Sequence, residues 1–134
     1  MSVKNTSVNK ILFAETMAKY YAPYQNWFLP LKNKCKEIIS FDFRKNHLYY
    51  GKKRMNEMFL DLVKRERPDY IFFWLLYDEY DLNTFLQIKK ISPKTKTVVF
   101  SGDDDTQFHY YMRYYALFVD YLMIVHTEFI PEYK

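Results

Sequence analysis

Short apolar segments alternate with helix-length intervals along this chain. Branched and aromatic residues of the kind found in strands make up five of these segments, at 10–13, 37–43, 70–76, 97–101 and 121–125. Such alternation is typical of an α/β fold in which helices cover both faces of a mainly parallel sheet. The pattern predicts a Rossmann-like three-layer α/β/α sandwich with about five strands.

The intervals between the apolar segments carry helical periodicity. The residues at 55–63 follow the i, i+3, i+4, i+7, i+8 spacing of one buried stripe. A shorter stripe over 82–91 is followed by Pro93, and a third covers 108–119. The pattern at 25–35 is less regular because a proline lies inside it. These intervals supply the helices that an α/β sandwich needs.

Composition describes one folded domain spanning residues 1–134. Hydrophobic residues make up 49% of the chain and charged residues 27%, which is typical of a folded protein. Aromatic residues reach 21%; they suit a surface that stacks on sugars or bases, but the simpler interpretation is enrichment of core and surface alike. The net charge of +4 comes from scattered clusters at predicted helix ends, and acidic clusters elsewhere argue against a nucleic-acid partner.

The sequence also bears on compartment. Cys35 is the only cysteine, so no intrachain disulfide forms and a reducing compartment is expected. The first residues are polar, unlike a signal peptide, and the longest apolar run, 71–77, is too short to cross a bilayer. We therefore expect a cytoplasmic protein with no integral membrane segment.

Carboxylates gather after the predicted strand at 97–101. Gly102 allows a sharp turn there, and Asp103, Asp104 and Asp105 follow it directly. Ligands of open α/β sheets bind at the carboxyl ends of the strands, so this loop is the first candidate for a functional site. Carboxylates suit a hydroxyl-rich ligand or a Mg²⁺ or Mn²⁺ ion. An aspartate before a helix also caps its free N–H groups, and we expect Asp104 or Asp105 to do this.

Other predicted strands end in polar residues as well. Asp78 follows the third strand, with Glu79 and Asp81 close behind, and the last strand leads into His126, Thr127 and Glu128. His126 has the chemistry of an acid, a base or a hydroxyl ligand, or simply of an edge hydrogen bond. Arg113, on the third predicted helix, is placed either to pair with the aspartates or to face solvent. The histidines and Cys35 do not have the spacing of a zinc site.

The loop after the first strand limits the choice of cofactor. It begins at Glu15, and no glycine occurs before Gly51. Dinucleotide-binding loops and Walker loops need glycines so that the backbone can approach phosphates. We therefore expect no NAD, FAD or other cofactor in this domain.

The second half of the chain resembles a known family. Arg67-Pro68-Asp69 precedes an apolar strand, the next predicted strand ends in paired aspartates, and Val119-Asp120 opens the last one. This order is similar to the N-terminal half of bacterial glycosyltransferases with the GT-B fold, in particular the group related to the CgeB spore-maturation proteins. The resemblance covers about residues 65–134.

The resemblance implies an acceptor-binding domain of a glycosyltransferase, which moves a sugar from a nucleotide-sugar donor to a hydroxyl acceptor such as a carbohydrate. The donor would bind in a C-terminal domain outside these 134 residues, so this domain alone is expected to be inactive. By the same resemblance, Asp103 and Asp104 face the interdomain cleft, where they are the candidate catalytic residues. The candidate substrate-binding residues are Glu15, Asp78, Asp105, Arg113, His126, Thr127 and Glu128.

Two other functions remain open from the residues. One is a non-enzymatic flavodoxin-like or receiver-like interaction module, in which Asp78 would stand where a receiver carries its phosphorylated aspartate. The other is a Mg²⁺-dependent phosphotransfer or hydrolase domain built on Asp103, Asp104 and Asp105.

Overall fold

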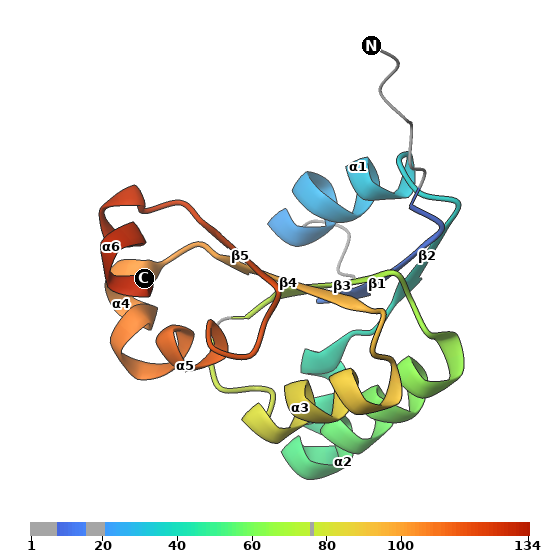
Figure 1. Cartoon of the computed structure of the whole chain (residues 1–134). Coiled ribbons are helices and arrows are strands. Elements are labelled where there is room, and N and C mark those ends of the chain that lie inside the picture. The colour runs from blue at the N-terminus through green and yellow to red at the C-terminus, as the bar shows by residue number, and fades with distance from the viewer. Residues whose placement is uncertain (1–7, 16–20, 76) are drawn as a thin grey trace.

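The computed structural model describes residues 8–15, 21–75 and 77–134. Its centre is a five-stranded sheet in the order β2-β1-β3-β4-β5, and every neighbouring pair is parallel (Figure 1). The strands are β1 (Lys10–Ala14), β2 (Glu37–Ser40), β3 (Tyr70–Trp74), β4 (Lys96–Ser101) and β5 (Tyr121–Ile124). The predicted α/β fold and number of strands are confirmed, and the sheet is wholly parallel.

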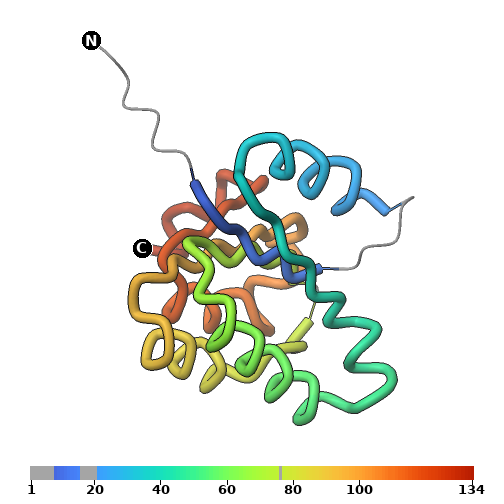
Figure 2. The backbone as a smooth tube through the Cα atoms, turned by 90° about the vertical axis from the view of Figure 1, so that its right-hand side faces the viewer, coloured from blue at the N-terminus to red at the C-terminus, as the bar shows by residue number. Residues whose placement is uncertain are grey.

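Helices lie on both faces of this sheet. The π-helical turn η1 (Tyr24–Phe28) and α1 (Leu29–Lys32) cover one face, and α2 (Phe43–Glu66) and α3 (Leu82–Ile91) cover the other (Figure 1). The helices α2 and α3 run side by side (Figure 2). The remaining elements are α4 (Asp104–Gln107), the π-helical turn η2 (Phe108–Met112), α5 (Arg113–Tyr115), the 3₁₀ turn η3 (Thr127–Phe129) and α6 (Ile130–Tyr133). The molecule is therefore the three-layer sandwich that the pattern predicted.

Alternation along the central strands builds two separate cores. Phe13 and Phe72 stack at 5.6 Å on the face covered by α1, where Phe28 joins them. Their sequence neighbours Leu12 and Phe73 point to the opposite face, into the larger core formed with α2, α3 and α5. Because successive strand residues face opposite sides of the sheet, each buried central strand contributes side chains to both cores.

Helix α2 starts earlier and ends later than the stripe at 55–63 predicted. Asp42 caps its first turn, with Oδ1 accepting a hydrogen bond from the backbone N–H of Lys45 at 3.0 Å. The predicted strand at 37–43 is therefore wrong in its last residues, because the cap turns the chain into a helix. Inside α2, Gly51 has φ 78° and ψ 166°, a conformation that is essentially glycine-only. This residue breaks α2 into a first segment, 43–50, and a longer second one.

Other predicted boundaries shift by a few residues. The strand predicted at 70–76 ends at Trp74, and Leu76 lies outside the described residues. The helix predicted at 108–119 begins at Asp104 and ends at Tyr115. The helix predicted at 25–35 is present as far as Lys32, as η1 followed by α1 with Pro30 near the junction, and residues 33–35 form a turn and a bend.

Candidate functional site

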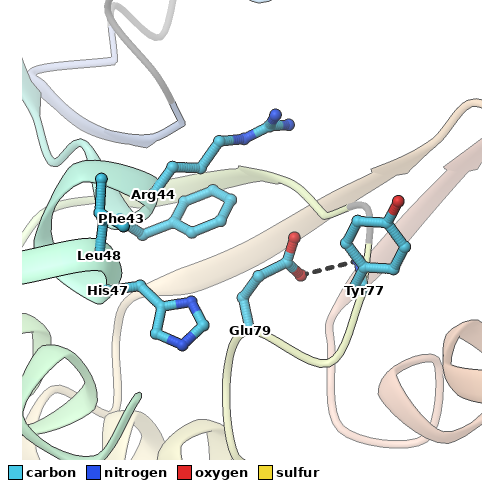
Figure 3. A pocket seen from close by; sticks show the side chains of 6 residues that line it. All are labelled: Phe43, Arg44, His47, Leu48, Tyr77 and Glu79. Carbon is cyan, nitrogen blue, oxygen red and sulfur yellow. Dashed lines mark hydrogen bonds between the residues drawn. The ribbon is translucent and has the colours of Figure 1, made fainter. Parts of the chain in front are cut away.

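The carboxyl ends of the five strands form one edge of the sheet, called here the carboxyl edge. Strands β2 and β3 lie on opposite sides of β1, so the strand order reverses between β1 and β3. A pocket of about 530 Å³ opens at this carboxyl edge, built from the start of α2 and the loop after β3. Figure 3 shows its lining residues: Phe43, Arg44, His47, Leu48, Tyr77 and Glu79. A crevice at the point of strand reversal is where open α/β sheets bind ligands.

An ion pair between β1 and α2 supports this pocket. Glu15, directly after β1, is fully buried, and its Oε1 lies 3.0 Å from Nε of Arg44. Nη2 of the same arginine donates a hydrogen bond to Oε2 at 3.4 Å. Sequence reasoning proposed Glu15 as a substrate ligand, but the side chain is fully enclosed and its observed partner is Arg44. Its role here is to position Arg44.

The loop after β3 is held against α2 by Asn56. Its Oδ1 accepts hydrogen bonds from Oγ1 of Thr84 at 2.6 Å and from the backbone N–H of Asp81 at 3.0 Å. Its Nδ2 donates to the backbone carbonyl of Glu79 at 3.2 Å. The sequence analysis missed Asn56, although an asparagine next to the apolar stripe of 55–63 was a usable signal. This residue fixes the loop that carries Tyr77 and Glu79.

Asp78, predicted as a substrate ligand, is exposed at this carboxyl edge. Its Oδ2 lies 3.3 Å from Nζ of Lys52, which also lies 3.4 Å from Oδ1 of Asp81. Within the same loop, Oε2 of Glu79 accepts the backbone N–H of Tyr77 at 2.9 Å. The loop therefore presents carboxylates and the ring of Tyr77, and Lys52 of α2 pairs with two of those carboxylates.

Tyrosines line two hollows beside the pocket of about 530 Å³, which is called here the Arg44 pocket. One hollow of about 470 Å³ is lined by Tyr77, Asp103, Thr106, Gln107, Tyr110 and Tyr111. A smaller one of about 220 Å³ lies between Lys52, Asp78, Tyr80, Asp81, Leu82, Tyr110, Tyr111, Tyr114 and Tyr115. Tyr77 also lines the Arg44 pocket and meets Tyr111 edge-to-face at 6.1 Å. We call the hollow of 470 Å³ the tyrosine hollow; Tyr77 joins it to the Arg44 pocket.

The three aspartates after β4 have three different environments. Asp103 is exposed and lines the tyrosine hollow, whereas Asp105 is exposed without lining it. Asp104 is fully buried, and its Oδ1 accepts hydrogen bonds from Ser101 at 2.7 Å and from the hydroxyl of Tyr133 at 2.5 Å. Burial and this bond raise the pKa of Tyr133 above its ordinary value. Asp104 therefore ties α6 to the end of β4.

The expected side-chain cap on the helix after β4 is wrong. Asp103 occupies the N-cap position, and its side chain makes no capping hydrogen bond there. Its backbone carbonyl accepts the N–H groups of Thr106 and Gln107 instead. Asp104 and Asp105 are already inside the first turn, where their charge meets the positive end of the helix. The carboxylate of Asp103 is thus available to the tyrosine hollow.

The remaining predicted site residues do not join this arrangement. Nδ1 of His126 lies 3.4 Å from Oε1 of Glu128, and Thr127 beside them is exposed. A backbone N–H and His126 hold the pKa of Glu128 below its ordinary value. The guanidinium of Arg113 lies over the ring of Tyr114 at 4.8 Å and donates to its hydroxyl, so it does not pair with the aspartates. His126, Thr127, Glu128 and Arg113 do not line any of the hollows described above.

The buried tyrosines behind the site lie among carboxylates. The hydroxyl of Tyr115 donates to the backbone carbonyl of Tyr80 at 2.5 Å. Burial and the charge of Glu79 raise the pKa of both tyrosines well above 10.0. Both hydroxyls therefore stay neutral at physiological pH, and that of Tyr115 serves as a hydrogen-bond donor.

Among the described residues, no three histidine, cysteine, aspartate or glutamate side chains are grouped as a metal ion would need. Over the same ranges, no helix combines the length and apolar character required to span a membrane. No protein-family model matches the sequence, and a search of curated proteins finds no significant relative.

Proposed function

We propose that this domain binds a hydroxyl-rich acceptor, such as a carbohydrate, as the acceptor-side domain of a GT-B glycosyltransferase. The complete enzyme would move a sugar from a nucleotide-sugar donor, bound by a further domain, to a hydroxyl of this acceptor. The observation that carries the proposal is the tyrosine hollow at the carboxyl edge, which three tyrosines line together with Asp103.

The lining of the tyrosine hollow matches the surface of a sugar ring. A pyranose has an apolar C–H face, which packs on an aromatic ring, and hydroxyls at its rim, which hydrogen-bond to carboxylates and amides. Tyr110 is 72% exposed and Tyr77 62% exposed, so their rings are open to such packing. Asp103 and Thr106 lie in the same wall to meet the hydroxyls.

Within this proposal, Asp103 is the better candidate for accepting a proton from the acceptor hydroxyl. Its carboxylate is exposed and lines the hollow, whereas Asp104 is buried and its Oδ1 is held by Ser101 and Tyr133. A general base must reach the proton that it removes, so accessibility favours Asp103. Asp104 would then serve to position the loop.

Saturation-transfer NMR on the 134-residue protein, with a panel of mono- and disaccharides, tests the proposal. We expect at least one sugar to receive magnetisation, and Tyr110→Ala or Asp103→Asn to weaken its binding about ten-fold, as for the loss of one stacking ring or charged hydrogen bond. Tyr49→Ala is the matched control, because Tyr49 is 70% exposed but lines none of the hollows. Transfer to no sugar, or equal loss in the control, contradicts the proposal.

The strand order favours a second candidate, a flavodoxin-like interaction module. Flavodoxin and receiver domains have the order 2-1-3-4-5, which is the order of this sheet. Asp78 lies in the loop after β3, but its carboxylate contacts Lys52. Incubation with acetyl phosphate and Mg²⁺ distinguishes the two: a stable phosphoryl adduct on Asp78, absent in Asp78→Asn, supports the module over the acceptor domain.

A further inference from the structure

The edge of the sheet opposite the site carries exposed cations. At this amino edge, where the strands begin, α2 and α3 end and lead into β3 and β4. Among the basic side chains exposed there are Lys64, Arg67, Lys90 and Lys94, at the ends of the two helices and in the turns that follow them. None of the four has an ion-pair partner among the described residues. The amino edge therefore presents uncompensated positive charge.

The acidic residues of the amino edge are already engaged. Glu66 pairs with Lys10 at 3.2 Å and with a neighbouring arginine at 3.0 Å. Asp120 pairs with Lys89 and with a second lysine. Oδ2 of Asp69 accepts the backbone N–H groups of residues 9 and 10. Glu66 and Asp120 are therefore paired with other cations and Asp69 with backbone N–H groups, and none of these contacts involves Lys64, Arg67, Lys90 or Lys94.

The hollows of the two edges differ in charge. At the amino edge, a hollow of about 280 Å³ is lined by the cations Arg67 and Lys94 and by Asp69, whose Oδ2 is held by two backbone N–H groups. At the carboxyl edge, the tyrosine hollow and the hollow of 220 Å³ are lined by the carboxylates of Asp78, Asp81 and Asp103 beside Lys52, and the Arg44 pocket contains Arg44 and Glu79. An extended anionic surface would attract the first edge and repel the second, which fixes one orientation of the protein.

We propose that the amino edge docks on the surface of a bilayer containing anionic phospholipids. Basic side chains near such a surface each contribute to binding, and the hollow at Arg67 and Lys94 offers a lipid phosphate two cations against the one carboxylate of Asp69. In this orientation the tyrosine hollow faces away from the bilayer, open to the aqueous phase.

An exposed leucine favours a bilayer over a nucleic acid as the partner. Leu117 is 77% exposed in the turn before β5, the same turn whose Asp120 contacts Lys89. Apolar side chains beside cations are the composition of membrane-surface segments. No aromatic ring lines the hollow at Arg67, so a base would find no stacking platform there.

Vesicle co-sedimentation of the 134-residue protein tests the proposal, using phosphatidylcholine vesicles with and without about one-third phosphatidylglycerol. We expect binding only to the anionic vesicles and release in high salt, because salt screens exposed charges. The triple variant Arg67→Gln, Lys90→Gln, Lys94→Gln should bind these vesicles roughly a hundred-fold more weakly, because the loss of each cation weakens binding about five-fold. The matched control replaces Lys45, Lys53 and Lys134 by glutamine, exposed lysines away from the amino edge.

Several outcomes overturn the proposal. Equal binding by the triple variant and its control places the docking surface elsewhere, and equal binding to neutral vesicles removes the role of charge. Release by millimolar inorganic phosphate at constant ionic strength indicates a site for free phosphate instead of lipid. Transfer of the protein from anionic vesicles to a short DNA duplex, at equal phosphate concentration, indicates a nucleic-acid surface. Circular dichroism of both variants checks that each is folded.

Discussion

Nε of Arg44 lies 3.0 Å from Oε1 of Glu15, and this pair joins the end of β1 to the start of α2. The carboxylate is fully buried, whereas the arginine side chain is about one-third exposed. The pair thus holds one wall of the Arg44 pocket, and its contribution is measurable as stability.

Arg44→Gln is expected to lower the free energy of unfolding by about 2 kcal/mol, because a buried carboxylate loses its charged partner. The partial exposure of Arg44 keeps the loss below the 3–5 kcal/mol seen for enclosed pairs. Urea denaturation measures it. The double variant Glu15→Gln, Arg44→Gln should recover part of the lost stability, since no buried charge remains. If the effects of the two single substitutions simply add in the double variant, the pair contributes nothing to stability.

Gly51→Ala is expected to destabilise the protein by about 1–3 kcal/mol through the backbone alone. A methyl group at Gly51 would meet no atom within 4 Å, so no steric clash adds to the conformational cost of φ 78°. Thermal or urea unfolding measures the change. Lys53→Ala, at an exposed position two residues further along α2, is the control and should stay within about 0.5 kcal/mol of the parent. Equal stability of both variants would mean that α2 straightens without cost.

Alkaline pH is expected to unfold this protein through its buried tyrosines. Burial raises the pKa of Tyr80 and Tyr115 in the folded state, so both ionise near 10.0 only after unfolding. Their contribution is fully present below pH 10 and is lost as pH rises above it. Chemical denaturation between pH 8 and pH 11 should show this fall, and Tyr115→Phe should make it shallower. A parallel slope in parent and variant would exclude Tyr115 as a cause.

Acid pH is expected to weaken the contact between α3 and the turn before β5. Burial raises the pKa of Asp120, but hydrogen bonds from Lys89 and Thr97 lower it by more, to below 3.8. The stabilisation is therefore present above pH 3.8 and is lost as pH falls through the lower folded value. Asp120→Asn should be less stable than the parent at pH 7 and approach it near pH 2. A constant difference across this range would contradict the assignment.

The fold could be predicted from the local sequence pattern, because the residues of each helix or strand carry its periodicity within a short stretch of chain. The stripe at 82–91 and the apolar run of β4 matched their elements closely. The errors occur where a single side-chain contact, or a partner distant in the sequence, determines where an element ends or what surrounds a residue. Asp42 ends β2 by capping a helix, and Asp104 is enclosed by Tyr133, a residue 29 positions away. Neither contact leaves a periodic signal in the sequence.

The sequence predicted at which edge of the sheet the candidate site residues lie, but not which side chains from the helices join them. The rule that ligands bind at the carboxyl ends of parallel strands located Asp78 and Asp103 correctly at one edge. The tyrosine hollow and the Arg44 pocket require side chains from helices that only the packing of the layers brings there. The pairing of Glu15 with Arg44 is of this kind, since no spacing rule links β1 to the start of α2.

Gly51 also determines how far α2 extends along the sheet that it covers. A continuous helix of 24 residues would measure about 36 Å, whereas a five-residue strand of this sheet measures about 17 Å. A straight α2 would project well beyond the layer that it covers. The break at Gly51 instead lets one helix serve two tasks: its longer part spans the sheet, and its first two turns carry Arg44 and His47 to the rim of the pocket.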